Sequence, residues 1–455
     1  MPPPLRYFGT DGIRGPFGEP PLDIPFLRRF GFALGRWLAA HRSAGSQTAT
    51  KLRILVGRDP RVSGPAILAA LAEGLVASGH QVFDLGVVPT PAVPMAMLAG
   101  GNFGVMITAS HNPPSDNGVK LFDKRGLKLD ESAEADLESW IDREPALPPA
   151  VSAVPLPTRD ALEEYCRLRA AVLPPLALAG WVVALDPGHG ATCATTPAVF
   201  RQLGATMHVR AGEPDGARIN VDSGSEHPEK LAALVRETGA RAGFAHDGDG
   251  DRLVACDETG AIADGDQLLG ALALHALRSG RLPHGLVVAT VQSNLGLDRA
   301  VAAAGGRVVR VPVGDRHVLH KLLELGAGLG GENSGHYIFP AQTRSGDGLL
   351  SALELARVML ETGRPLSELC REVPLLPQRT AAVRVREKIP FEKTPAFAAA
   401  LRSVENALAG RGRVLARYSG TEKKLRLLVE GPDAAELGKL LAQLQAAASQ
   451  ELGAS

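Results

Sequence analysis

The sequence predicts an α/β protein made of three tandem domains of similar architecture, each with a mixed or parallel sheet, and a smaller C-terminal α+β domain, around a central cleft. Three observations support this prediction. The chain has 455 residues, several times the length of one ordinary domain. Short β-branched runs alternate with longer amphipathic runs over most of it, as expected for strands and helices around a mostly parallel sheet. After Pro374–Gln378 this alternation gives way to a different pattern.

The first domain is expected over residues 1–154. Its predicted elements are the helices Phe26–Ala40 and Pro65–Ser78 and the strands Leu52–Val56, Gln81–Leu85 and Gly104–Ile107. It ends in Glu144–Pro157, which is rich in proline and alanine and has neither a helical nor a strand period. Such a segment is typical of an interdomain connection.

The alternation starts again in the second domain, expected over residues 155–260, and in the third, over residues 261–372. The second has predicted strands Trp181–Leu185, Ala205–Val209 and Ala242–Ala245 and helices Pro197–Leu203 and Pro228–Thr238. The third has strands Leu286–Thr290 and Val308–Val311 and helices Leu295–Ala304 and Gly348–Thr362. The fourth, over residues 373–455, has strands Ala381–Arg386, Val414–Tyr418 and Leu425–Glu430 and helices Pro395–Leu408 and Ala434–Ala448.

Charge and composition exclude several classes of protein. The 49 Lys and Arg residues balance the 49 Asp and Glu residues, so no net positive charge would attract nucleic acid or an anionic membrane over the whole surface. The four cysteines lie far apart, which favours reduced, structural thiols. No secretory signal follows Met1, and no run of roughly 18 apolar residues is present. We therefore expect a cytoplasmic monomer or homodimer with a small-molecule partner and neither nucleic acid nor membrane as partner.

The segment Ile107–Lys120, ITASHNPPSDNGVK, follows a predicted strand and is expected to be a rigid loop with a sharp turn at Asn117 and Gly118. Ser110 and His111 then lie just beyond the strand end, where ligands of open α/β sheets collect. A hydroxyl at this place can carry a phosphoryl group, but it can equally cap a turn.

Lys120 follows the predicted turn by two residues. If the chain returns to the same site, its ammonium can act as a general acid, a general base or a positive clamp. Taken alone, a lysine at this distance from the serine is more often a solvated surface residue.

The segment Asp247–Arg252, DGDGDR, comes directly after a predicted strand. Its alternating glycines leave Asp247, Asp249 and Asp251 on one side of an extended turn, uncrowded by other side chains. Carboxylate oxygens favour magnesium over zinc. Three close carboxylates also repel one another and need a counter-charge, which favours a bound ion over an empty acidic turn.

A calcium loop is the main competitor for this segment. The three aspartates fit positions 1, 3 and 5 of such a loop, and Glu258 falls at position 12. The match fails at position 6, which requires glycine and holds Arg252. In addition, the flanks read as strands and not as the helices of a calcium-binding hand.

Two further segments carry weaker signals. In Gly330–His336, GGENSGH, one carboxylate and neighbouring polar groups suit recognition of a sugar ring. In Arg417–Arg426, RYSGTEKKLR, hydroxyl and backbone donors lie between two arginines, which suits a phosphate. Taken alone, Gly330–His336 fits a tight polar turn in water better than a sugar site, whereas Arg417–Arg426 fits a solvated basic hairpin and a phosphate site equally well.

These four segments, in this order and after FGTDGIRG at Phe8–Gly15, resemble the α-D-phosphohexomutase family over nearly the whole chain. ITASHNP with DNGVK resembles the family's phosphoserine loop, DGDGDR its magnesium loop, GGENSGH its sugar-recognition loop and SGTE its phosphate loop. The resemblance implies an isomerase that works through a phosphoserine and a hexose 1,6-bisphosphate.

The resemblance also implies roles for individual residues. Ser110 would be phosphorylated and would join Asp247, Asp249 and Asp251 around one Mg²⁺ per chain. The transfer site would be lined by Arg14, His111, Lys120, Arg252 and His336. The sugar would be held by Glu332, Asn333 and Ser334, and the phosphate that is not being transferred by Arg417, Ser419, Gly420, Thr421 and Arg426.

Further segments resemble the branch of the family that interconverts glucosamine 6-phosphate and glucosamine 1-phosphate. They are FGTDGIRG, VGRDPRVSG, GVVPTPAV and VGDRHV. Two positions depart from that branch, which usually has glutamine in place of Asn333 and proline in place of Lys423. Mutases of mannose or glucose phosphates therefore stay open as alternatives, as do a magnesium-dependent phosphatase and a noncatalytic binding protein.

Overall fold

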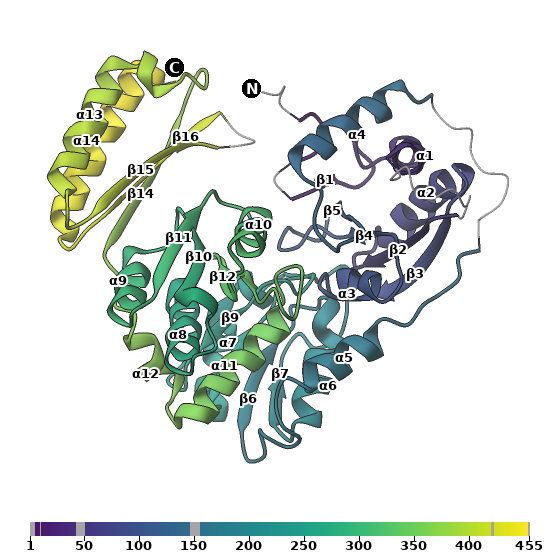
Figure 1. Ribbon diagram of the computed structural model, residues 1–455, viewed down its shortest axis with the longest axis horizontal. Coiled ribbons are helices and arrows are strands. Elements are labelled where there is room, and N and C mark those ends of the chain that lie inside the picture. The colour runs from purple at the N-terminus through teal and green to yellow at the C-terminus, as the bar shows by residue number, and fades with distance from the viewer. Residues whose placement is uncertain (1–4, 10, 42–50, 146–154, 420–422, 454–455) are drawn as a thin grey trace.

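The computed structural model describes residues 5–9, 11–41, 51–145, 155–419 and 423–453. Four sheets follow one another along the chain, and the units that contain them are arranged in an arc, with both ends of the chain on one side (Figure 1). The predicted fold class is confirmed. The exact domain boundaries, near residues 155, 261 and 373, stay a prediction.

The first unit has a five-stranded sheet in the order β1-β5-β4-β2-β3. The strands are β1 (Ile13–Pro16), β2 (Arg53–Arg58), β3 (Gln81–Val87), β4 (Phe103–Ile107) and β5 (Asp116–Phe122). The helices are α1 (Ile24–Ala40), α2 (Gly64–Ala77), α3 (Ala92–Leu98) and α4 (Glu131–Arg143). Strands β3, β2 and β4 are parallel, and β5 is antiparallel to β4.

The second and third units repeat this plan with four strands each. The second has the order β7-β6-β8-β9, with β6 (Val182–Asp186), β7 (Thr206–Val209), β8 (Ala242–Ala245), β9 (Val254–Cys256), α5 (Leu162–Ala170), α6 (Thr196–Gln202) and α7 (Pro228–Thr238). The third has the order β11-β10-β12-β13, with β10 (Leu286–Thr290), β11 (Arg307–Val311), β12 (Leu329–Gly331) and β13 (Tyr337–Ile338). Its helices are α8 (Gly265–Arg278), α9 (Leu295–Ala303), α10 (Asp315–Leu325), α11 (Gly348–Thr362) and α12 (Leu366–Arg371).

The first three sheets place their motif loops at the same topological position. In each, a parallel strand is followed by a loop and then by an antiparallel neighbour: β4 to β5, β8 to β9 and β12 to β13. The serine segment, the DGDGDR segment and the GGENSGH segment occupy these three connections. The carboxyl ends of strands in such sheets are the usual places for ligands, so the fold repeats one site position three times.

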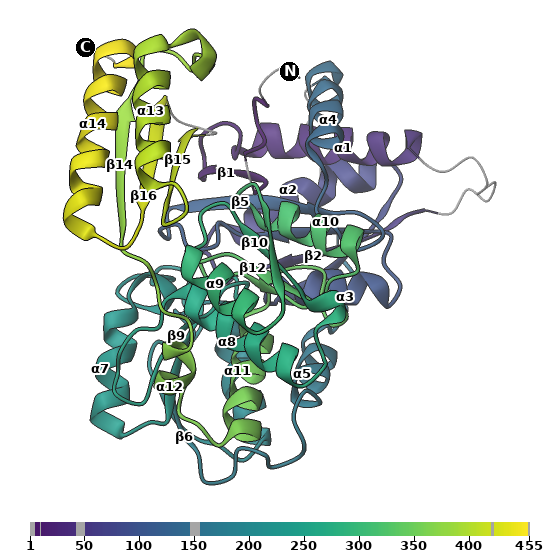
Figure 2. The same cartoon turned by 60° about the vertical axis from the view of Figure 1, so that its left-hand side comes forward.

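The fourth unit is an antiparallel sheet in the order β14-β16-β15. Its elements are β14 (Gln378–Arg384), β15 (Arg413–Tyr418), β16 (Lys424–Glu430), α13 (Pro395–Leu408) and α14 (Ala434–Leu452). The two helices cover one side of the sheet (Figures 1 and 2). Leu425, Leu427 and Val429 pack beneath them in a core that contains residues of this unit alone. In contrast, one continuous apolar cluster includes residues of all of the first three units.

One local prediction was wrong. Asn117 and Gly118 do not form a turn; they lie within β5, which pairs with both β1 and β4. Glycine is needed at position 118 because a Cβ there would lie 2.4 Å from the carbonyl oxygen of Ile13 and 2.6 Å from that of Thr108. The residue permits close approach of three strands, and the strand delivers Lys120 to the site.

The remaining general predictions concern thiols and membranes. All four cysteines are free thiols, and burial raises the pKa of Cys193, Cys256 and Cys370 to about 12. In the described part of the chain, every helix is too short or too polar to span a lipid bilayer.

Candidate active site

The serine loop and the acidic loop meet face to face. Ser110 lies after β4, and its Oγ donates a hydrogen bond of 2.6 Å to Oδ2 of Asp247, which lies after β8. The two residues are 137 positions apart in the sequence, and both are buried. Two motifs that were separate predictions therefore form one site.

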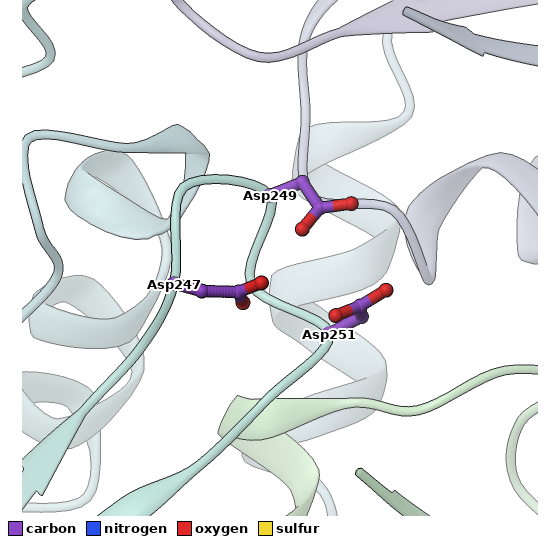
Figure 3. A group of neighbouring side chains, drawn as sticks. All are labelled: Asp247, Asp249 and Asp251. Carbon is purple, nitrogen blue, oxygen red and sulfur yellow. The ribbon is translucent and has the colours of Figure 1, made fainter. Parts of the chain in front are cut away.

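The three aspartates of the acidic loop converge (Figure 3). Ligand atoms of Asp247, Asp249 and Asp251 lie within 4.8 Å of one another, and all three residues are buried. The flanks of the loop are strands β8 and β9, as predicted, which excludes the helix–loop–helix arrangement of a calcium hand.

The donor set fits a hard divalent cation. All the converging atoms are carboxylate oxygens, and Oδ1 of Asp249 is buried without a hydrogen-bond partner among the described residues. Burial and the neighbouring carboxylates Asp249 and Asp251 raise the pKa of Asp247 to about 8. An ion held by these oxygens would remove that repulsion, and oxygen-only ligands suit magnesium.

Lys120 neutralises part of this charge. Its buried ammonium lies 2.8 Å from Oδ2 of Asp249, 2.9 Å from Oδ2 of Asp251 and 3.1 Å from Oδ2 of Asp11. Burial lowers the pKa of Lys120, but these three carboxylates outweigh it and raise the pKa well above the ordinary value. Lys120 is therefore a fixed cation, which favours the clamp or acid role over the base role.

His336 is a second cation beside the loop. Its Nε2 lies 2.8 Å from Oδ1 of Asp251, and its Nδ1 lies 3.4 Å from Oε2 of Glu332. Burial opposes protonation, but Asp251 and Glu332 raise the pKa of His336 to about 10. Glu332 also accepts a 3.0 Å bond from the backbone nitrogen of Gly314, so the third motif loop joins the site with its carboxylate held in place.

His111 is the contrasting neutral imidazole. Its Nδ1 lies 3.3 Å from Oγ of Ser110, and burial together with Arg252 and Arg14 lowers the pKa of His111 to about 3. Arg252 lies 3.9 Å from Oδ2 of Asp247, and Arg14 pairs with Asp11. The Nε atoms of both arginines are buried without a hydrogen-bond partner in the described residues, as expected for groups that await an anion.

The residues predicted to bind the sugar and the phosphate that is not being transferred are mostly less buried than the triad, and two of them lie outside the described residues. Asn333 and Ser334 lie exposed in the turn between β12 and β13. Arg417 and Arg426 face each other across β15 and β16, and burial and Arg426 lower the pKa of Arg417. Ser419 is buried next to them, whereas Gly420 and Thr421 lie outside the described residues.

Four residues with contacts to the site were missed by the sequence predictions. Thr90 donates a 2.5 Å bond from Oγ1 to Oδ2 of Asp249, and Asp11 pairs with Lys120 and Lys128. Arg61 and Asn220 hold the backbone of the serine loop. Asp11, Arg61 and Thr90 lie in the motifs FGTDGIRG, VGRDPRVSG and GVVPTPAV, so membership of these motifs was the sequence signal that could have identified them. Nothing in the local sequence marks Asn220.

Comparison with known proteins agrees with this geometry. Models of the phosphoglucomutase/phosphomannomutase family match here as alpha/beta/alpha domain I over residues 5–147, domain II over 163–260, domain III over 264–375 and the C-terminal domain over 381–447. A solved structure of a phosphoglucomutase/phosphomannomutase family protein from Burkholderia thailandensis is 26% identical, has a TM-score of 0.80 and is covered to 98%, as is this chain.

The chain belongs to the phosphoglucomutase/phosphomannomutase family, the phosphohexomutases. Within that family, two similar curated relatives are named phosphoglucosamine mutase. The one from Moorella thermoacetica is 45% identical over 450 residues, covering 98% of this chain and 99% of the relative. The one from Symbiobacterium thermophilum is 42% identical over 452 residues, again covering 98% and 99%. The resemblance predicted from the motifs is confirmed.

Proposed function

We propose that the protein interconverts glucosamine 6-phosphate and glucosamine 1-phosphate through a phosphoserine at Ser110. One observation carries the proposal: the Ser110 hydroxyl is bonded to Asp247 within the buried triad, so a phosphoryl on Oγ would lie among Asp247, Asp249 and Asp251. The naming of the two curated relatives supports glucosamine phosphate as the substrate.

Each half-reaction is a balanced transfer. In the first, the O1 hydroxyl of glucosamine 6-phosphate forms a bond to phosphorus, the Oγ–P bond of phosphoserine breaks, and the hydroxyl proton ends on Oγ. The resulting 1,6-bisphosphate turns end for end. In the second, Oγ of Ser110 forms a bond to the 6-phosphoryl phosphorus, the P–O6 bond breaks, and the Oγ proton ends on O6. Glucosamine 1-phosphate is released and Ser110 is phosphorylated again. A hexose 1,6-bisphosphate can start the cycle by phosphorylating Ser110 directly.

The chain supplies the charges that the transfer requires. Phosphate monoesters react so slowly in water that barrier reduction on the order of 20 kcal/mol is needed, mostly from positioning and charge neutralisation. Lys120 and His336 are buried cations at the triad, and Arg14 and Arg252 have buried Nε atoms available to phosphoryl oxygens. A magnesium ion held by the three aspartates would polarise the phosphoryl oxygens when bound.

His111 is suited to move the proton. It is neutral in the absence of phosphate, and its Nδ1 lies 3.3 Å from Oγ of Ser110. A phosphoryl dianion on Ser110 would attract the protonated imidazole and raise the pKa of His111 towards neutrality. In this assignment Lys120 is a clamp and His111 is the proton carrier.

Substrate recognition is assigned to the third and fourth units. Glu332, with Asn333 and Ser334, would bind the sugar hydroxyls. Arg417, Arg426 and Ser419, with Gly420 and Thr421, would bind the phosphate that is not being transferred. Two arginines facing each other across neighbouring strands repel, so an anion between them is stabilised.

A substrate panel tests the proposal. Glucosamine 1-phosphate, mannose 1-phosphate and glucose 1-phosphate are each assayed with glucose 1,6-bisphosphate as primer and MgCl₂. We expect the highest kcat/KM for glucosamine 1-phosphate and no turnover by Ser110→Ala. A preference for mannose 1-phosphate or glucose 1-phosphate would identify the protein as a mutase of that sugar phosphate instead. Release of inorganic phosphate without isomer formation would identify a phosphatase.

A further inference from the structure

Ser110 has an unusual backbone conformation. Its φ is 53°, in the left-handed region that residues with a Cβ rarely adopt, and the residue is buried. Such a conformation costs free energy and persists only where the surroundings hold it. The contacts that hold it are therefore of interest for the reaction itself.

Arg61 provides most of these contacts. Its side chain is 0% exposed, and all five guanidinium donors are used. Nε binds Oδ2 of Asp59 at 3.0 Å. The other four donors bind backbone carbonyl oxygens of the serine loop: Ser110 at 2.9 Å, Asn112 at 2.7 Å, Asp116 at 2.9 Å and Pro113. One side chain thus fixes the path of the loop from Ser110 to Asp116 at the start of β5.

Asn220, from the second unit, grips two of the same carbonyls. Its Nδ2 lies 2.8 Å from the carbonyl oxygen of Ser110 and 3.0 Å from that of Asn112. Asn220 is itself buried with a left-handed φ of 62°. The serine loop is therefore held at the same two points by its own unit and by the unit that carries the aspartates.

Two more contacts close the arrangement. Thr108 accepts a 2.8 Å bond from the backbone nitrogen of Ser110 and donates one of 2.6 Å to the carboxylate of Asp59. On the other side, a Cβ added to Gly248 in the acidic loop would lie 2.7 Å from the carbonyl oxygen of Ser110. Thr108 thus holds Ser110 within its own unit, and glycine at position 248 lets the acidic loop pack closely against the Ser110 carbonyl.

We propose that Arg61 and Asn220 are positioning residues that set the distance and direction of Ser110 Oγ relative to the three aspartates. The inference rests on the phosphoserine function proposed above. Both residues act through the backbone of the serine loop, because neither contacts the hydroxyl. A misplacement of about 1 Å in a transfer site can lower the rate about 100-fold.

The test compares conservative substitutions. Arg61→Lys keeps the charge but has fewer donors and cannot reach four carbonyls. Asn220→Asp keeps the shape but turns a carboxylate oxygen towards two carbonyl oxygens, so we expect it to be worse than Asn220→Ala. The controls are Arg28→Lys, in the partly buried ion pair with Glu73, and Asn102→Ala, which removes a bond to the backbone of Arg53. Both controls lie in the first unit.

Four quantities are measured for each variant: the melting temperature, kcat, KM and the rate at which radiolabelled glucose 1,6-bisphosphate phosphorylates Ser110. We expect Arg61→Lys and Asn220→Asp to lower kcat and the labelling rate about 100-fold with KM changed less than about threefold. The two controls should lower the melting temperature at most and leave the labelling rate within about twofold.

The outcomes separate the two proposals. If the wild type is not labelled at Ser110, the proposed function is wrong and this inference falls with it. If the wild type is labelled and folded Asn220→Asp is labelled equally fast, the positioning role is wrong. Asn220→Asp decides the question if Arg61→Lys does not fold.

Discussion

The proposed transfer site and the proposed phosphate site of the fourth unit differ in how deeply their residues are buried. At the transfer site, Ser110 and the three aspartates are at most 1% exposed and are fixed by bonds from two different units. At the phosphate site, Arg417 is only partly buried and Arg426 is exposed. The first site is assembled in advance, whereas the second presents its cations at a surface.

The packing around the two sites differs in the same sense. The first three units share one apolar cluster, while the fourth has a core of its own. The fourth unit meets the third through polar contacts centred on the Arg413–Glu430 ion pair, with Arg413 also binding the carbonyls of Val291 and Ser293. A separately packed unit can move as a body. We therefore expect the buried site to stay fixed during transfer and the separately packed fourth unit to shift when the intermediate turns.

The largest expected effect comes from removing the phosphoryl acceptor. Ser110→Ala should lower mutase activity by at least about 10⁴-fold, because no other described hydroxyl replaces Oγ at Asp247. Ser115→Ala, exposed in the same loop, is the matched control and should retain activity. Residual activity of Ser110→Ala within about tenfold of wild type would show that the buried site does not carry the phosphoryl group on Ser110.

Metal binding should stabilise the transfer site specifically. We expect MgCl₂ at about 100 times its dissociation constant to raise the free energy of unfolding by about 2.7 kcal/mol. Asp249→Asn should abolish this increase and lower kcat about 100- to 1,000-fold. Thermal unfolding with and without EDTA measures the first effect. An unchanged magnesium response in Asp249→Asn would show that the ion binds elsewhere.

Substitutions at the proposed phosphate site of the fourth unit should affect substrate binding more than the transfer step. Arg417→Ala should raise KM about 10- to 100-fold, the value of one or two charge-assisted hydrogen bonds, and should release more bisphosphate per turnover. Arg402→Ala, exposed on α13 of the same unit, is the control. If Arg417→Ala instead lowers kcat with KM unchanged, the fourth unit takes part in the transfer step.

The last prediction concerns the pH dependence of stability at the contact between the first and third units. Burial raises the pKa of Glu134 from 4.5 to about 7, although Arg316 lies 2.9 Å away. Between these values the folded protein holds a proton that the unfolded chain releases, so stability should fall as the pH rises from about 5 to 7, by up to about 3 kcal/mol.

Urea unfolding of wild type and Glu134→Gln at several pH values measures this effect. The difference between the two proteins should change over that window, whereas Glu131→Gln, exposed on the same helix, should follow wild type. Parallel curves for wild type and Glu134→Gln would contradict it.

Local sequence patterns predicted which residues carry the chemistry better than they predicted the contacts that these residues make. The three aspartates were found because alternating glycines leave a readable signature within six residues. Lys120 was also predicted, but the backbone that places it was predicted as a turn and is a strand. Gly118 is typical of a turn in the sequence, whereas in the structure it permits close packing of strands. Arg61 and Asn220 were missed because their role depends on which carbonyls the fold brings to them.

The proposed phosphate site of the fourth unit shows a similar limit of sequence-based prediction. Arg417 and Arg426 were predicted as a phosphate site from a loop pattern, and the sheet brings them face to face. The change of pattern after Pro374–Gln378 predicted this unit as a separate domain, and it has a core of its own. The pattern could not indicate that the first three units share one apolar cluster, because that depends on packing between distant elements.

We expect Ser110 Oγ and the aspartate triad to hold the phosphoryl group together. The most direct test is peptide mass spectrometry of the protein after incubation with glucose 1,6-bisphosphate and MgCl₂, with and without a chase of glucosamine 6-phosphate. We predict one phosphoryl group on Ser110 that the chase removes into glucosamine 1,6-bisphosphate, and no labelling of Asp249→Asn on the same timescale. A phosphoryl group on another residue, or none on Ser110, would contradict the account.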